Sequence, residues 1–115
     1  MEIVHYVSPN GKVPTLEYLN GLIDKKQKKK IYDDISRLEI FGQQKLLAAG
    51  KVEKIKGYSV DIWELKTSCV SNMIYRTLFG IINDKIIILN IFNKKEMRIR
   101  RREIAKSISR LKQNI

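Results

Sequence analysis

The sequence is poor in the residue types that build disulfides and metal sites. Its 115 residues include one cysteine, Cys69, and one histidine, His5. A single cysteine cannot form an internal disulfide, and one cysteine with one histidine is too few for a zinc site made of those ligands. Cys69 is disfavoured as a catalytic nucleophile, because His5 is the one histidine that could activate it. We therefore expect neither a metal nor a cofactor.

Long hydrophobic segments are also missing. The longest apolar stretch, Ile86 to Leu89 with Ile91 and Phe92 just beyond it, has the length of a strand. A membrane span needs roughly 20 apolar residues. The first residues, Met1 to Tyr6, lack the basic start and long apolar segment of a signal peptide. These absences predict a cytoplasmic protein without a membrane partner.

Positive charge, by contrast, is abundant. Lys and Arg number 23 against 12 Asp and Glu, which gives a net charge of +11 and a pI near 9.9. Because a small domain stays soluble with a net charge of about 2 to 8, this excess indicates a polyanionic partner, and nucleic acid is the commonest one in a cytoplasm. A basic surface without a specific role is the simpler alternative. The length and the 43% hydrophobic content fit one domain over residues 1–115.

The first part of the chain predicts a strand and a short helix. Ile3 to Val7 has strand character and ends at the turn-forming residues Ser8 to Gly11. From Pro14 or Thr15 onward, apolar residues follow helical spacing as far as Ile23.

A second helix is predicted to follow at once. Asp24 can cap it, with Gln27 as the capping-box partner. We expect Gly42 to end this helix and a loop to run from Gln43 to Gly50. The lysines within residues 25–30 lie at its start, where the helix dipole disfavours cations. They indicate either a solvated face or a patch facing RNA or a partner.

The second half of the chain predicts an antiparallel meander and a final helix. Four segments alternate apolar and polar residues and are separated by short breakers. They are Val52 to Lys56, Val60 to Lys66, Asn72 to Phe79, and Lys85 to Phe92. The last of them is apolar enough to lie near the middle of the sheet. Ile104, Ile108 and Leu111 then mark an amphipathic helix with a basic outer face. The fold class is therefore α+β, with the first two helices packed on one face of the sheet.

One pair of charged residues stands out in the predicted sheet. Alternation places Glu64 among Ile62 and Lys66 on one face of its strand, and Arg76 on one face of the next strand. Since hairpin partners show matching faces, Glu64 and Arg76 are expected within ion-pair reach. A plain cross-strand salt bridge is the simpler interpretation of this pair.

Cations gather on both sides of that pair in the sequence. Asn93 to Arg102 holds six Lys and Arg residues between the last strand and the final helix, and we call these the C-terminal bank. Lys54 and Lys56, here called the lysine bank, lie on the first strand of the meander. Two banks that flank a Glu-Arg pair are typical of a groove for a phosphate backbone.

The order of several short motifs resembles a known family. The residues that carry the resemblance are Gly11, Pro14, Tyr18, Leu19 and Leu22, then Ile35, Leu38 and Gly42, then Lys54 with Gly57, Ile62 to Lys66, Tyr75-Arg76, Phe92 with Lys94-Lys95, Glu103-Ile104, and Arg110. Together they span nearly the whole chain and resemble the phage-derived toxins of the RelE/HigB type.

This resemblance implies the RelE/ParE fold, a helical hairpin against a small antiparallel sheet with a C-terminal helix that contributes to the site or to antitoxin contact. Relatives of the RelE and HigB kind cut messenger RNA in the ribosomal decoding site, whereas ParE relatives inhibit DNA gyrase. The fold alone does not choose between these targets. Ile99-Arg100 stands where the family commonly has Thr-Pro, which leaves the start of the last helix open.

The residues suggest a mechanism for RNA cleavage without a metal. The ribose 2′-hydroxyl is the nucleophile, and it needs a base, an acid for the departing 5′-oxygen, and cations for the charge that builds on phosphorus. We expect Arg76 to stabilise the transition state and Glu64 to act as the base or to orient Arg76. Lys94 is the expected acid, with its pKa lowered by neighbouring cations. The residues expected to bind the RNA backbone are Lys54, Lys56, Lys66, Lys95 and Arg98.

The expected activity is that of a toxin of a type II toxin-antitoxin system, an endoribonuclease whose partners are the ribosome, messenger RNA and a cognate antitoxin. Two alternatives remain open at this point. One is a ParE-like inhibitor of DNA gyrase, and the other is a non-catalytic basic module that binds nucleic acid.

Overall fold

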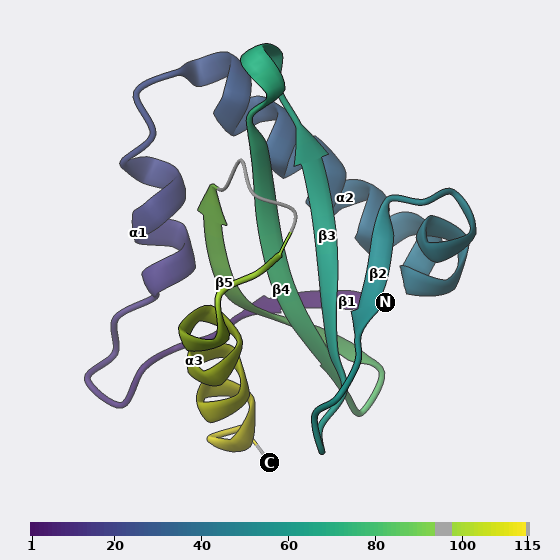
Figure 1. Ribbon diagram of the computed structural model, residues 1–115. Coiled ribbons are helices and arrows are strands. Elements are labelled where there is room, and N and C mark those ends of the chain that lie inside the picture. Colours follow the sequence, from purple (N-terminus) through teal and green to yellow (C-terminus); the bar gives the residue numbers. More distant parts are fainter. Residues whose placement is uncertain (94–97, 115) are drawn as a thin grey trace.

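The computed structural model describes residues 1–93 and 98–114, and within them a five-stranded mixed sheet forms the centre of the molecule (Figure 1). Strands β2 (Val52–Ile55), β3 (Ile62–Ser68), β4 (Ile74–Ile82) and β5 (Lys85–Asn93) form the antiparallel meander predicted from the sequence. Strand β1 (Glu2–His5) pairs with β5 in parallel, so the strand order is β1-β5-β4-β3-β2. The α+β class is confirmed.

Helices cover both faces of this sheet. Helices α1 (Pro14–Asn20) and α2 (Lys25–Ala48) lie on one face, where Leu19 and Ile31 join a core that includes Phe79. Helix α3 (Arg101–Lys112) lies on the opposite face, where it contacts β5, β4 and β3, and its Leu111 packs into a second core (Figure 1). The expectation that the first two helices share one face is confirmed. Strand β5 is buried between the layers, as its apolar sequence requires.

Helix α2 begins as predicted but ends later. The Asp24 side chain accepts hydrogen bonds from the backbone N–H groups of Lys26 and Gln27, so it caps the helix. The Gln27 side chain does not complete a capping box and instead accepts a hydrogen bond from the Tyr75 hydroxyl. At Gly42 the backbone leaves helical geometry (φ 79°, ψ 167°), but a helical path resumes as far as Ala48. The expected loop from Gln43 was wrong, because Leu46 uses a further helical turn to reach the core.

The hairpin of β4 and β5 depends on the turn that connects the two strands. Asn83 and Asp84 both have positive φ (51° and 62°), and they form the tight two-residue turn that joins the antiparallel strands β4 and β5.

The break expected at Thr67-Ser68 was wrong, because β3 continues through both residues. Thr67 is buried and donates a hydrogen bond to Asp34 of α2 over 2.8 Å, which keeps this end of β3 in the sheet. The connection to β4 follows as the short 3-10 helix η1 (Val70–Asn72).

Helix α3 has the predicted amphipathic pattern. Ile104 and Leu111 are buried, and Ile108 packs against the same core. The helix begins at Arg101, and the side chain of the N-cap residue, Arg100, makes no capping hydrogen bond. Among the described residues, no helix is both long enough and apolar enough to cross a membrane.

Candidate nucleic-acid groove

Glu64 and Arg76 lie on the face of the sheet that α3 covers. In the register of β3 and β4, Lys66 is opposite Arg76 and Glu64 is opposite Leu78, so Glu64 and Arg76 are diagonal neighbours. Arg76 Nη1 donates a hydrogen bond to Glu64 Oε2. Each side chain is only 4% exposed. The contact predicted from strand alternation is therefore present, but it is a buried ion pair rather than an exposed one.

Lys66 adds a second cation to this pair. Its ammonium lies 3.9 Å from Glu64 Oε1 and 2.7 Å from Glu53 Oε1 on β2. The Glu64 carboxylate thus has Arg76 at one oxygen and Lys66 near the other. The Lys66 ammonium donates a hydrogen bond to Glu53, so this lysine links the carboxylates of Glu53 and Glu64 at the base of the site.

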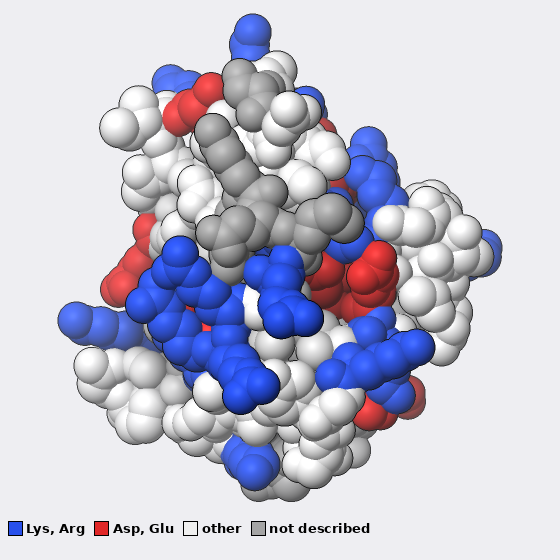
Figure 2. Space-filling model, in the orientation of Figure 1, with Lys and Arg blue, Asp and Glu red and all other residues white. Residues whose placement is uncertain are grey.

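A groove of about 440 Å³ opens above these residues. Its walls come from β2 and the turn after it, from β3, and from the segment that leads into α3. The lining residues are Glu53, Lys54, Ile55, Lys56, Tyr58, Glu64, Arg98, Ile99, Arg101 and Ile104. On this face of the molecule, basic side chains lie on both sides of a small acidic area (Figure 2). We call this feature the cationic groove, and it brings members of the two predicted banks to one place.

The lysine and arginine side chains of the groove differ in their contacts. Lys56 and Arg98 are exposed residues on its two sides. Lys54 borders the groove, but its ammonium lies 3.1 Å from Asp61 Oδ1 and 5.7 Å from the ring centroid of Trp63. Trp63 packs into the core on the opposite face of the sheet. The lysine bank is therefore split, because the Lys54 ammonium contacts Asp61 at the edge of the groove, whereas Lys56 is an exposed residue of the lining.

Two of the predicted site residues lie outside the described residues. These are Lys94, the expected acid, and Lys95, an expected backbone contact. The described residues on either side of them are Asn93, at the end of β5, and Arg98, in the wall of the groove.

The alternative nucleophile is not supported by the geometry. His5 Nδ1 lies 2.7 Å from Thr15 Oγ1, which ties β1 to α1. Burial lowers the pKa of His5 and raises the pKa of Cys69, so both side chains favour their neutral forms. Cys69 follows the far end of β3 and is not among the residues that line the cationic groove. A protonated thiol is a poor nucleophile.

The sequence comparison agrees with this arrangement. The family model described as Phage derived protein Gp49-like (DUF891) matches residues 17–112. The chain belongs to this family. The Gp49-like family is phage-derived and lies among the RelE/HigB-like toxins. In a comparison with curated proteins, no sequence matched.

The matched segment of this Gp49-like protein contains all of the cationic groove. It runs from α1 to the end of α3, and so includes the Glu64 and Arg76 pair as well as Lys56 and Arg98. Strand β1 precedes it. The match is therefore to the part of the Gp49-like chain that builds the groove and both helical layers.

Sequence reasoning missed Tyr58 of the groove in this Gp49-like protein. Tyr58 lines the groove from the turn after β2, and an aromatic residue beside the turn-forming Gly57 was the signal that could have indicated it. Arg101 was placed both in the C-terminal bank and on the basic face of the last helix, and it lies in the first turn of α3, where it borders the groove. Alternation along strands gives no information about a residue in a turn, so Tyr58 was not predictable by that route.

Proposed function

We propose that this protein is the toxin of a type II toxin-antitoxin system and that it is a metal-independent endoribonuclease that cuts messenger RNA on the ribosome and so inhibits translation. The observation that carries the proposal is the cationic groove with the Glu64 carboxylate in its lining. Membership of the Gp49-like family, which lies among RelE-like toxins, supports the same activity.

The groove suits a sugar-phosphate strand because cations stand on both of its sides. Lys56 on one side and Arg98 and Arg101 on the other are exposed and can each approach a phosphate. We assign Lys54 and Lys95 to supporting contacts along the same strand. Each phosphate neutralised releases counterions, so the slope of log Kd against log salt should change by roughly 0.7 per contact on single-stranded RNA.

In the proposed reaction, Glu64 is the general base. Its carboxylate takes the proton of the ribose 2′-hydroxyl, and the resulting oxygen attacks the adjacent phosphorus to form a 2′,3′-cyclic phosphate. The bond from phosphorus to the 5′-oxygen breaks, and that oxygen leaves with a proton from Lys94, the proposed acid. Arg98 and Arg101 offset the charge that builds on the phosphate oxygens.

The burial of Arg76 changes the role first expected for it. A guanidinium that is 4% exposed and already bonded to Glu64 offers no surface to a phosphate in this conformation. Arg76 is better placed as a positioning residue, which fixes the orientation of the Glu64 carboxylate through its hydrogen bond. We therefore replace the expected direct contact of Arg76 with the phosphate by an indirect role, in which Arg76 acts through Glu64.

The ribosome completes this mechanism by aligning the messenger. The site offers few groups for chemistry, and in-line placement of the 2′-oxygen and the departing oxygen can lower the barrier by several kcal/mol. We therefore expect free RNA to be cut slowly and RNA held in the decoding site to be cut fast. The antitoxin that neutralises so basic a protein should carry acidic segments that compete for the groove.

The decisive experiment is induction of the protein in a bacterial host, followed by mapping of messenger RNA ends against the reading frame. Cuts in register with codons are the expected result. Purified protein should then be compared on one transcript with and without ribosomes, and equal rates would reject the ribosome-dependent mechanism.

A matched pair of variants tests the base. Glu64→Gln should slow cleavage roughly 100- to 10,000-fold, the range typical of removing a general base. Glu53→Gln makes the same change directly across from it on β2 and should leave cleavage nearly intact. Equal activity in the two variants would remove Glu64 from the chemistry.

The same induction distinguishes the other functions. DNA damage signalling with intact messenger RNA would assign the protein to gyrase inhibition of the ParE kind. Normal growth on induction, with full-length protein present, would leave a non-catalytic basic module that binds nucleic acid.

A further inference from the structure

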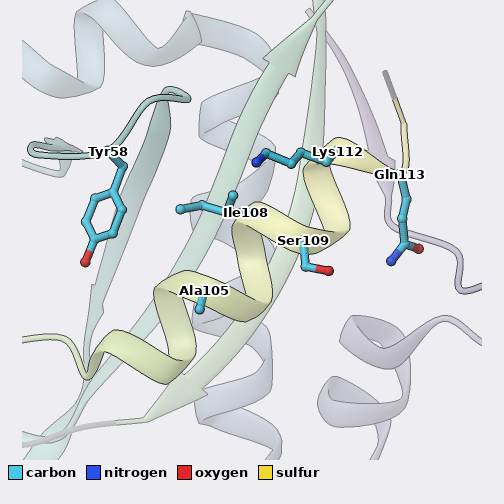
Figure 3. A pocket seen from close by; sticks show the side chains of 6 residues that line it. All are labelled: Tyr58, Ala105, Ile108, Ser109, Lys112 and Gln113. Carbon is cyan, nitrogen blue, oxygen red and sulfur yellow. The ribbon is translucent and has the colours of Figure 1, made fainter.

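A second hollow lies beside the cationic groove, along the flank of α3. It has a volume of about 590 Å³, and we call it the α3 hollow. Its lining residues are Tyr58, Ala105, Ile108, Ser109, Lys112 and Gln113 (Figure 3). Tyr58 is the residue that borders both hollows. A ligand long enough to occupy both hollows would therefore pass the Tyr58 side chain.

The walls of the α3 hollow combine an aromatic ring with an apolar helix flank. Tyr58 comes from the connection between β2 and β3, and it stays 39% exposed. Ile108 and Lys112 extend from α3 toward the side on which Tyr58 lies (Figure 3). An exposed tyrosine that faces an isoleucine leaves apolar area in water that a flat ligand can cover, while Lys112 offers a donor at the rim.

We propose that the α3 hollow binds one unpaired nucleobase, stacked on Tyr58, from the same strand whose phosphates lie in the cationic groove. This inference rests on the proposed function and adds to it a binding site for the base. Three observations favour a base as the occupant. The hollow shares Tyr58 with a groove lined by cations, its volume falls in the range of small-ligand pockets, and its apolar walls end at polar groups that can reach a base edge.

The proposal predicts that Tyr58 makes the protein prefer single-stranded RNA over a duplex. Stacking on an aromatic side chain requires a base that is splayed out of a helix, so the hollow accepts single-stranded RNA and rejects a duplex. The cationic groove alone does not discriminate in this way, because phosphates are present in both forms. Preference for single strands is thus expected to depend on Tyr58 and not on Lys56 or Arg98.

The test uses the full-length protein and a fluorescently labelled single-stranded RNA in which every 2′-hydroxyl is methylated, so that no cleavage occurs during the measurement. Kd is measured by fluorescence anisotropy over a series of salt concentrations. Tyr58→Leu should weaken binding roughly five- to a hundred-fold at each salt concentration, the loss typical of removing one stacking aromatic. The slope of log Kd against log salt should stay that of the wild type, because no phosphate contact is removed.

Four controls separate stacking from other causes. Tyr58→Phe should bind nearly as well as the wild type, since it keeps the ring. Phe41→Leu removes another exposed aromatic ring, on α2, and should leave Kd unchanged. A duplex of the same sequence should bind Tyr58→Leu and the wild type equally. The melting temperature of Tyr58→Leu should match that of the wild type.

Several results would overturn the proposal. Unchanged single-strand affinity of Tyr58→Leu would do so, and loss of antitoxin binding in that variant would then assign the hollow to protein contact. Equal losses on single strand and duplex, or a Tyr58→Phe variant as weak as Tyr58→Leu, would also exclude stacking. A wild type that binds neither form would remove the base site, whereas the nuclease is tested by cleavage on ribosomes.

The two proposals fail in different ways. If Tyr58→Leu loses single-strand affinity but the wild type cuts no messenger on ribosomes, the base site stands and the nuclease does not. If the wild type cuts messenger but Tyr58→Leu keeps full affinity, the nuclease stands without this base site.

Discussion

Glu64 and Arg76 face one another diagonally across β3 and β4, and the two side chains form a buried ion pair beneath the cationic groove. Removing one partner of such a pair leaves an uncompensated charge away from water, whereas replacing both with apolar residues is often neutral. The pair therefore affects stability and the proposed chemistry in ways that can be separated.

The first prediction concerns this pair. Arg76→Ala should lower the free energy of unfolding by about 3 to 5 kcal/mol, because Glu64 stays buried without its main partner. The double variant Glu64→Leu, Arg76→Met should recover most of that stability and remain inactive. Urea denaturation measures the first effect, and cleavage on ribosomes measures the second. A double variant as unstable as Arg76→Ala would show that the pair stabilises the fold in a way that apolar packing cannot replace.

The second prediction concerns the contact between the sheet and α3. A Cβ atom at Gly80 would lie 2.7 Å from Leu111 Cδ1, and Leu111 is buried in the core beneath α3. Gly80→Ala should therefore destabilise the fold by about 1 to 3 kcal/mol through overpacking. Leu111→Val removes the crowded atoms, so the double variant should be less destabilised than the sum of the two single variants. Purely additive losses in denaturation would show that Gly80 and Leu111 are not coupled.

The third prediction concerns the kink in α2. Gly42 has φ 79° and ψ 167°, a backbone region that is nearly confined to glycine, and a Cβ added there would meet no atom within 4 Å. Gly42→Ala should cost about 1 to 3 kcal/mol from backbone strain alone. The cost should appear as a lower midpoint in urea with an unchanged slope. A stabilised variant would mean that the kink straightens into one continuous helix.

The fourth prediction concerns pH. Burial lowers the pKa of His5 below its ordinary value of 6.5, so the folded state binds this proton less readily than the unfolded state. The contribution of neutral His5 to stability is therefore fully present above pH 6.5 and is lost as the pH falls through the window below it. The melting temperature of the wild type should drop between pH 7.5 and pH 5.5. His5→Gln should show a shallower drop, and identical drops would exclude His5 as the cause.

Local sequence patterns were enough to predict most of the fold. Strand alternation gave the meander and put Glu64 and Arg76 on one face, because side-chain direction depends only on local backbone geometry. The Asp24 cap and the apolar stripe of α3 follow from equally local rules. Charge clustering along the chain also indicated which segments border the groove.

The features that sequence reasoning missed depend on contacts between distant residues. Helix α2 continues past Gly42 because Leu46 packs against the sheet, and β3 continues through Thr67 because Asp34 accepts its hydrogen bond. Lys54 turns toward Asp61 and Trp63, which no periodicity reveals. The depth at which Arg76 is buried likewise depends on how layers stack and not on its position along a strand.

The parallel pairing of β1 with β5 joins two segments that are far apart in the sequence. During synthesis, β1 can pair with its neighbour only after β5 has emerged from the ribosome, since a parallel partner cannot be supplied by a nearby turn. The walls of the cationic groove come from residues 53–64 in the middle of the chain and residues 98–104 near its end. The groove can therefore form only after the start of α3 has been synthesised.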